Sequence, residues 1–244
     1  MKGRQIAFRL LLAAGIGLGG LFAGARMQGL GVKDVCAIAK NVVQARLDRR
    51  TVEDRVAEIL AKKPGLKTVA ESARGPLRIL VFKQERMVEV QAPGWSAPRL
   101  YPMTGFSGTL GPKLREGDGQ IPEGVYGLEY LNPNSSYHLS MKVSYPNAED
   151  RAQAAKEGRT NLGGDIMIHG SNATVGCVPV GDEAIEELFY LAQAAGLRNV
   201  SVVIAPYDMR AGRKPEFEKS PLPWYPALCD RIAAGLCERG RTRK

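Results

Sequence analysis

The stretch GGDIMIHGSNATVGCVPVGDEAIEE, residues 163–187, decides how this chain is interpreted. An apolar run, Ile166 to Ile168, predicts a short buried strand that ends at His169. A turn rich in glycine and asparagine follows, and Cys177 comes eight residues after the histidine. A histidine base and a cysteine nucleophile in one glycine-rich loop have the composition of an activated-thiol site. An imidazolium beside a thiol lowers the thiol pKa, so the pair predicts a reactive thiolate at neutral pH.

Each of the two residues also has an interpretation without catalysis. A single cysteine is often an inert buried side chain, and a single histidine is often a hydrogen-bonded structural group. Zinc takes four protein ligands, or three and a water. The other histidine and cysteines show no paired ligand spacing: His138, Cys36, Cys229 and Cys237. We therefore expect no metal and no other cofactor.

The string from His169 to Cys177 resembles the histidine-to-cysteine signature of the L,D-transpeptidase (YkuD-type) catalytic domain family. That signature usually has serine where this chain has Thr174. Further motifs extend the resemblance over about residues 77–207: VFK at 81–83, GPK at 111–113 and PEGVY at 122–126. Two more are similar to the YafK-type branch in particular: PNSSY at 133–137 and YPNAEDR at 145–151.

The resemblance implies roles for several residues. Cys177 is the nucleophile and His169 its base. The backbone carbonyl of Gly170 accepts a hydrogen bond from the second imidazole nitrogen, and Thr174 retains the hydroxyl of the signature. The residues themselves suggest that the backbone amides of Gly176 and Cys177 bind the oxyanion.

Two basic residues are candidates for binding substrate carboxylates. Lys113 and Arg151 lie in motifs shared with the YafK-type branch. Solvated surface charge is an equal alternative for both.

One departure from the signature bears on the reaction. The arginine that usually follows two residues after the cysteine is replaced by Pro179, which has neither charge nor amide donor. The resemblance implies an enzyme acting on peptidoglycan peptide stems. We expect hydrolysis of an amide that joins peptidoglycan to a wall-attached protein, such as a wall-linked lipoprotein. Cross-linking by transpeptidation and a non-catalytic peptidoglycan-binding scaffold stay open as alternatives.

The composition of the chain limits the size of its core and the kinds of partner that it is expected to bind. The chain has 244 residues, 44% of them hydrophobic, which permits a substantial core. The formal net charge of +9 favours an acidic partner, or else simple solubilisation, because much of the charge lies near the termini. No motif that reads nucleic acid is present, so we expect no nucleic-acid partner.

The N-terminus is typical of a targeting segment. Lys2 and Arg4 precede a small and apolar run that ends at Ala25, and Ala23-Gly-Ala25 suits a signal peptidase. Residues 1–25 are therefore predicted to be a signal peptide, or an anchor in the inner membrane. Either leaves the remainder exported, in the periplasm or anchored facing it.

Four segments follow from the hydrophobic pattern. After residues 1–25, we expect a helical spacer at 26–72, although helices packed on their own domain explain it equally well. Residues 73–210 are predicted to form a mainly β catalytic domain, a sandwich or open barrel with few short helices. The resemblance implies the same fold. Residues 211–244 are predicted to be an extension with a short helix, in which Cys229 and Cys237 lie too far apart for a disulfide unless the helix breaks.

Overall fold

The structure is a computed structural model, and it describes residues 49–211 and 222–238. The expected signal peptide or anchor, the first part of the predicted spacer and Cys36 lie outside these residues. Within the described ranges, no helix is both long and apolar enough to cross a membrane.

The described chain is organised around one mixed sheet of eight strands in the order β3-β2-β1-β8-β4-β5-β6-β7. The β1–β8 and β6–β7 pairs are parallel and the other pairs antiparallel. The mainly β class is thus confirmed, with a single continuous sheet. The strands are β1 (Leu77–Phe82), β2 (Met87–Gln91), β3 (Arg99–Pro102), β4 (Gly124–Ser135), β5 (His138–Val143), β6 (Met167–His169), β7 (Val178–Pro179) and β8 (Val200–Ala205).

Strand β4 joins two halves of the sheet. Its first residues, from Gly124 to Gly127, pair with β8, and the register with β5 begins at Leu128. Two register shifts interrupt the β4–β5 ladder, as expected where a strand bends or bulges. One half therefore contains β3, β2, β1 and β8, and the other contains β5, β6 and β7 with the His169 and Cys177 segments.

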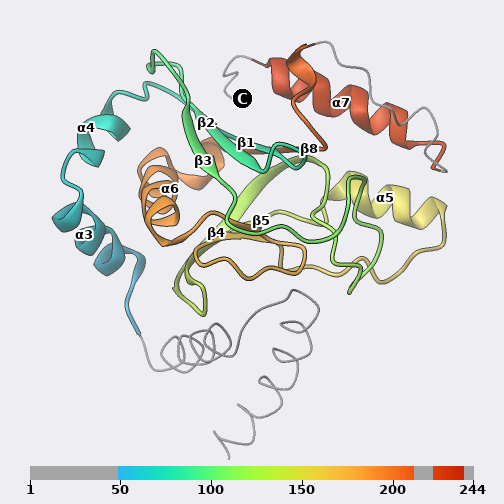
Figure 1. Cartoon of the computed structure of the whole chain (residues 1–244), viewed down its shortest axis with the longest axis horizontal. Coiled ribbons are helices and arrows are strands. Elements are labelled where there is room, and N and C mark those ends of the chain that lie inside the picture. Colours follow the sequence, from blue (N-terminus) through green and yellow to red (C-terminus); the bar gives the residue numbers. More distant parts are fainter. Residues whose placement is uncertain (1–48, 212–221, 239–244) are drawn as a thin grey trace, which may run out of the picture.

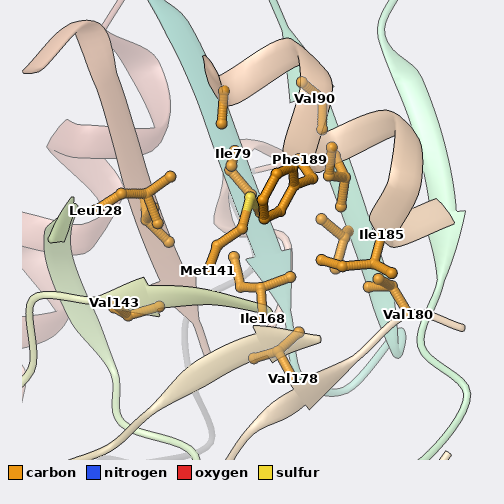
Figure 2. Close-up of a cluster of buried hydrophobic side chains, with 14 of the residues drawn as sticks. Ile79, Val90, Leu128, Met141, Val143, Ile168, Val178, Val180, Ile185 and Phe189 are labelled. Carbon is orange, nitrogen blue, oxygen red and sulfur yellow. The ribbon is translucent and has the colours of Figure 1, made fainter. Parts of the chain in front are cut away.

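Helix α6 (Asp182–Ala195) covers one face of the sheet (Figure 1). Its residues Ile185, Leu188, Phe189 and Ala192 recur at helical spacing and are fully buried. They meet apolar side chains from both halves of the sheet, including Ile79 and Ile168 (Figure 2). Each large side chain buried in this way contributes about 1.5–3 kcal/mol to folding. The α6 core therefore holds the two halves in one domain.

Helices α3 (Val52–Lys62) and α4 (Leu66–Glu71) lie in the described part of the predicted helical segment 26–72. Thr51 caps α3 in a capping box with Asp54, as its sequence predicts. Ile59 and Leu66 are buried in the same core as α6. Because their apolar faces are covered by the sheet and α6, residues 52–71 pack on the domain, as the alternative to a spacer expects.

Helix α7 (Tyr225–Cys237) covers the opposite face of β1 and β8 (Figure 1). Ile232 and Tyr225 are buried against Leu80 and Phe82 of β1. All of β1 is buried because helices cover both of its faces. Helix α7, the short helix expected in the C-terminal extension, therefore forms a packed layer on this face of the sheet.

The cysteines of α7 are unbridged. The helix runs through Cys229 and Cys237 without a break, and both thiols are free. Gly235 lies inside the helix, where a Cβ would come within 3.0 Å of Val125. Close packing, rather than a helix break, explains this glycine.

A buried ion pair ties α7 to the loop between β3 and β4. Lys83 donates to Glu123 Oε1 at 2.8 Å, to Gly111 O at 2.8 Å and to Ile121 O at 2.9 Å. Tyr225 donates to the second oxygen of Glu123 at 2.5 Å. We call this group the Lys83 anchor. It fixes the course of residues 103–123, which approach the cysteine loop.

Two elements were not expected from the sequence. Helix α5 (Ala148–Lys156) begins at Asn147, whose capping box with Asp150 lies in the YPNAEDR motif. Strand β7 contains Pro179, which is tolerated because β7 is the edge of the sheet.

Candidate active site

The register of the sheet brings Cys177 and His169 to one face. Ile168 is opposite Val178, and both point into the α6 core with Met141 of β5 (Figure 2). Side chains alternate between faces along a strand, so His169 and Cys177 point to the other face. The Met167 N–H donates to Cys177 Sγ at 3.4 Å, which confirms that the thiol lies beside β6.

His169 is held as a neutral base. Its side chain is buried, and Nδ1 lies 2.5 Å from Gly170 O. A carbonyl can only accept, so Nδ1 carries the hydrogen and Nε2 has the free lone pair. The hydrogen bond that the resemblance implies for Gly170 is thus present. Tyr137 packs against the imidazole, with ring centroids 4.7 Å apart.

The thiol is turned toward β6 and the segment before it. Cys177 Sγ donates to Asp165 O at 3.4 Å and accepts from Met167 N. Asp165 has a positive φ of 53°, so the chain turns sharply just before β6. These contacts orient a protonated thiol toward the backbone of residues 165–167.

The pKa directions at the pair are opposite to the expectation from the sequence. Burial lowers the pKa of His169 to about 4. Burial also raises the pKa of the Cys177 thiol, against smaller opposing effects of the Met167 N–H and nearby lysines. Removal from water disfavours the charged form of each group. The resting site therefore contains a neutral thiol and a neutral imidazole, without the ion pair that would produce a low-pKa thiolate.

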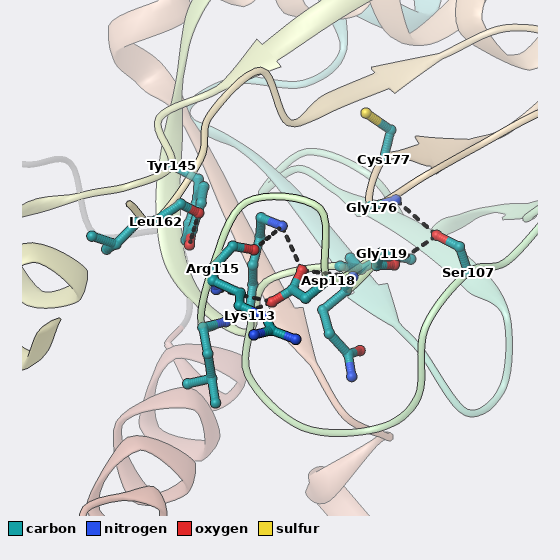
Figure 3. Close-up of polar contacts among 12 residues, drawn as sticks. Ser107, Lys113, Arg115, Asp118, Gly119, Tyr145, Leu162, Gly176 and Cys177 are labelled. Carbon is teal, nitrogen blue, oxygen red and sulfur yellow. Dashed lines mark hydrogen bonds and ion pairs between the residues drawn. The ribbon is translucent and has the colours of Figure 1, made fainter. Parts of the chain in front are cut away.

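Both amides expected to bind an oxyanion are occupied. The Cys177 N–H donates to Thr174 Oγ1 at 3.0 Å, and Thr174 Oγ1 donates to Cys177 O at 2.7 Å. The Gly176 N–H donates to Ser107 Oγ at 2.7 Å (Figure 3). In this state neither amide is available to a substrate carbonyl, which corrects the expectation of a ready oxyanion hole at these two groups.

The two glycines of the site are required by packing. At Gly170, a Cβ would lie 2.5 Å from Asp182 Oδ1 and 2.7 Å from Tyr137 O. Gly176 has a φ of +87°, and a Cβ there would lie 2.9 Å from Gln120 O. The left-handed backbone and the neighbouring loop explain Gly176, so approach of a substrate is not needed to account for it.

The two basic candidates differ in position. Lys113 pairs with Asp118 Oδ1 at 2.6 Å and donates to Arg115 O at 2.9 Å (Figure 3). Its charge still acts on Cys177, where it opposes the larger effect of burial on the thiol pKa. Arg151 is exposed, and it donates to Pro146 O and Asn147 O at the start of its own helix α5. The structure thus brings Lys113, but not Arg151, into the surroundings of Cys177.

Four further residues contribute to the site and were not singled out from the sequence. Ser107 binds Gly176, and Asp182 Oδ1 accepts from Ser171 N at 2.7 Å, which fixes the turn after His169. Tyr137 packs on the imidazole, and Lys142 influences the Cys177 thiol. Except for Asp182, these residues come from segments 30 or more residues from Cys177 in the chain. The sequence around the motif therefore carries no local signal for them.

A separate cavity of about 400 Å³ lies at the end of β2. Its lining includes Arg78, Gln91 and Trp95, and contains neither His169 nor Cys177. The candidate chemistry is therefore not at this cavity.

A buried histidine and a cysteine thus lie on one face of a mixed sheet, the combination of side chains found in activated-thiol sites. The sequence matches the L,D-transpeptidase catalytic domain (YkuD) family over residues 76–204, which is more than half of the chain. The chain therefore belongs to this family.

Curated relatives are similar over part of their length. The chain is 34% identical over 142 residues to YafK of Escherichia coli (strain K12), which is provisionally named an L,D-transpeptidase. YafK of Escherichia coli O157:H7 gives the same identity. Each alignment covers 55% of this chain and 55% of the relative, so the chain spans about half the length of the curated relatives it matches.

Solved structures show a weaker likeness. The helical cell shape determining protein Pgp2 from Campylobacter jejuni is 23% identical, with a TM-score of 0.41 over 60% of this chain and 56% of Pgp2. Bd1075 of Bdellovibrio bacteriovorus is also 23% identical, with a TM-score of 0.39 over 55% of this chain and 48% of Bd1075. The family assignment rests on the sequence match.

Proposed function

We propose that this protein is a peptidoglycan-acting cysteine enzyme that forms a thioester on Cys177. The observation that carries the proposal is the placement of Cys177 and His169 on one face of the sheet, with Nδ1 bound to Gly170 O and Nε2 left as the base. Membership of the L,D-transpeptidase family supports peptidoglycan peptide stems as the substrate class.

The first half of the reaction is acylation. His169 Nε2 takes the thiol proton as Cys177 Sγ attacks the substrate carbonyl carbon. The tetrahedral intermediate collapses, the C–N bond breaks, and the amine leaves with the proton from the imidazolium. The product is a thioester between the peptide and Cys177.

The neutral resting pair determines how this step begins. Because burial disfavours both charges, proton transfer and attack must occur together rather than from a stored thiolate. The substrate must also displace the thiol from Asp165 O, and an oxyanion donor must be freed or supplied as the site reorganises.

The second half decides between hydrolysis and cross-linking. We propose that water attacks the thioester, which regenerates the thiol and releases a carboxylate. The reason is Pro179, which replaces the usual arginine of the signature and pairs with His169 across β6 and β7. An arginine can hold a carboxylate through two hydrogen bonds, whereas proline offers no such grip for a second peptide. Water needs none.

The proposed substrate bond is an amide that joins peptidoglycan to a wall-linked protein such as a lipoprotein. The experiment is incubation with a protein-linked muropeptide and excess acceptor peptide, followed by mass spectrometry. Free muropeptide and released protein should dominate, and both should vanish in Cys177→Ala. Cross-linked dimers as the main product would identify a transpeptidase. Binding without turnover would identify a scaffold.

We also propose that the domain acts outside the cytoplasm, since residues 1–25 have the pattern of a signal peptide or an inner-membrane anchor. A reporter active only in the cytoplasm should be inactive when fused after Lys244. Recovery of a mature chain that starts at Arg26 would indicate cleavage, and retention of residues 1–25 in the inner membrane would indicate an anchor.

A further inference from the structure

Lys142 is a buried cation on the same face of the sheet as the nucleophile. It lies opposite Met167 in the β5–β6 ladder, and Cys177 lies beside Met167 on the other side. Lys142, Met167 and Cys177 thus form one row across three strands. The next row on this face contains Ser140, His169 and Pro179, paired in the same ladders.

The ammonium of Lys142 is poorly satisfied by the described residues. Its side chain is 8% exposed, and it donates to Tyr145 O at 3.4 Å. The nearest carboxylate oxygen paired with it, Asp165 Oδ1, is 3.8 Å away on a side chain that is 92% exposed. An ammonium has three donors, and burying one without partners is unfavourable. A group that is present only in a complex can supply the missing acceptors.

Two lysines act on the Cys177 thiol, and only one has capacity for a ligand. Both Lys113 and Lys142 oppose the larger effect of burial, which raises the thiol pKa. Lys113 is already bound to Asp118 at 2.6 Å and to Arg115 O at 2.9 Å. The remaining positive charge near the sulfur belongs to Lys142.

A bulge in β4 interrupts its ladder with β5 opposite Lys142. In the β4–β5 ladder, Leu128 pairs with Val143 and Leu131 with Met141, so Glu129 and Tyr130 lie opposite the single residue Lys142. Bulges often lie next to active sites, where they redirect side chains. Tyr130 is 44% exposed, which is unusual for a large aromatic side chain. The Lys142 row is therefore bordered by an accessible aromatic surface.

We propose that the Lys142 ammonium binds a carboxylate of the acyl donor, one that lies close to the scissile carbonyl. The inference rests on the proposed function for the peptide nature of the donor. The carboxylate would accept the two hydrogen bonds that Lys142 does not make within the described chain. Lys142 would also supply a positive charge in the row next to Pro179, a residue that has no charge of its own. Lys142 would then select donors with a free carboxylate over donors in which that carboxylate is amidated.

Alkylation of Cys177 tests the anion site without any peptidoglycan substrate. The probes are iodoacetate and iodoacetamide, which differ mainly in the carboxylate, and labelling of the Cys177 peptide is measured by mass spectrometry in the full chain. The iodoacetate to iodoacetamide rate ratio should fall by roughly tenfold in Lys142→Met, because a charge-assisted contact is lost. It should be retained in Lys142→Arg and in the control Lys67→Met, which removes an exposed lysine of α4. An equal ratio in wild type and Lys142→Met would overturn the proposal.

The unmutated protein provides a second measurement if Lys142→Met does not fold. Acetate should slow labelling of Cys177 by iodoacetate more than labelling by iodoacetamide, because acetate would occupy the ammonium. Equal slowing of the two reactions would contradict an anion site at Lys142.

Turnover then tests the identity of the ligand. A pair of muropeptide donors, identical except that the carboxylate near the scissile bond is free or amidated, should differ roughly tenfold in kcat/KM with the wild type. The preference should disappear in Lys142→Met and return in Lys142→Arg. An unchanged preference in Lys142→Met would refute the role in selection. If the wild type turns over neither donor, the proposed function fails, and the alkylation ratio still decides whether Lys142 binds an anion.

Discussion

Two buried lysines in this domain have opposite surroundings. Lys83, at the end of β1, has three acceptors within 2.9 Å, one of them the carboxylate of Glu123. Lys142, on β5, has one acceptor at 3.4 Å and a carboxylate oxygen at 3.8 Å. Both side chains are at most 8% exposed, so burial alone does not distinguish them.

The difference separates a structural charge from a functional one. All three donors of Lys83 are used, and Glu123 also accepts from Gly111 N and Tyr225 OH. A fully satisfied network can be maintained by folding alone. The donors of Lys142 are not matched in this way, and they lie beside the nucleophile. The half of the sheet around Lys83 is therefore expected to provide stability, and the half around Lys142 to provide chemistry.

The largest expected effect is on turnover at Cys177. In Cys177→Ala the proposed hydrolysis should fall by on the order of a thousandfold or more, because the covalent route is removed. The free energy of unfolding should change by less than about 1 kcal/mol, since the thiol is only half-buried and makes two long contacts. Turnover assays and urea denaturation of the same preparation measure both. Substantial residual turnover would show that the reaction does not use this thiol.

Loss of the Lys83 charge should have the next largest effect, and it should be on stability. Lys83→Met leaves Glu123 buried without its counter-charge, and breaking a buried pair in this way costs about 3–5 kcal/mol. Lys142→Met should change the free energy of unfolding by less than about 1 kcal/mol, because it removes a buried charge with little pairing to lose. Urea denaturation of both variants tests the comparison directly. Equal losses would abolish the distinction between the two lysines.

The pH dependence of Cys177 reactivity tests whether the resting site contains a neutral thiol and a neutral imidazole, or a thiolate and an imidazolium. The pKa of His169 is lowered to about 4, so its imidazole is already neutral throughout the range from weakly acid pH upward. The pKa of Cys177 is raised, so the thiolate fraction and the rate of labelling by iodoacetamide should increase only on the alkaline side of an ordinary thiol.

The matching control is His169→Asn. Because the imidazole is neutral at pH 7, its removal should leave the thiol titration nearly unchanged while abolishing turnover. An inflection of the labelling rate near pH 6.5 that disappears in His169→Asn would contradict this expectation. It would show instead that the two residues form an ion pair.

The smallest expected effect concerns Thr174. Its hydroxyl makes two hydrogen bonds to the Cys177 backbone, so Thr174→Val should lower the free energy of unfolding by about 1–2 kcal/mol. Thr174→Ser retains the hydroxyl and should lose less than about 0.5 kcal/mol. Thermal or urea denaturation measures the difference. If valine and serine gave equal stability, the hydroxyl would not be holding the cysteine loop.

Much of the fold could be predicted because it depends on local pattern. Apolar runs predict strands at residues 77–82 and 200–205, and helical spacing predicts a helix at 182–195. Strands β1 and β8 and helix α6 form with these bounds. The strand pattern at residues 100–106 predicts a longer strand than the structure contains, since β3 spans Arg99–Pro102. Helix α5 is not predicted by hydrophobic periodicity, and the local signal for it is the capping box of Asn147 and Asp150.

The domain boundaries could not be predicted from the same patterns. Helices α3 and α4 have the amphipathic spacing of a spacer, and equally that of a packed layer. The burial of Ile59 and Leu66 with α6 decides for the packed layer. Tyr225 and Ile232 decide in the same way for α7. Which surface an apolar face covers depends on contacts between segments far apart in the chain.

By itself, the sequence determined the family, the strand that carries His169, and the position of Cys177 eight residues further on, because these are encoded in one continuous stretch. Tertiary structure decided the electrostatic state of that pair. Packing buries His169 and partly shields Cys177 from water, which reversed the expected direction of the thiol pKa. It also placed Ser107 and Thr174 on the two amides, and brought Lys142 beside Cys177 across β6. Charge and hydrogen bonding depend on distance in space, and spacing in the sequence does not specify that distance.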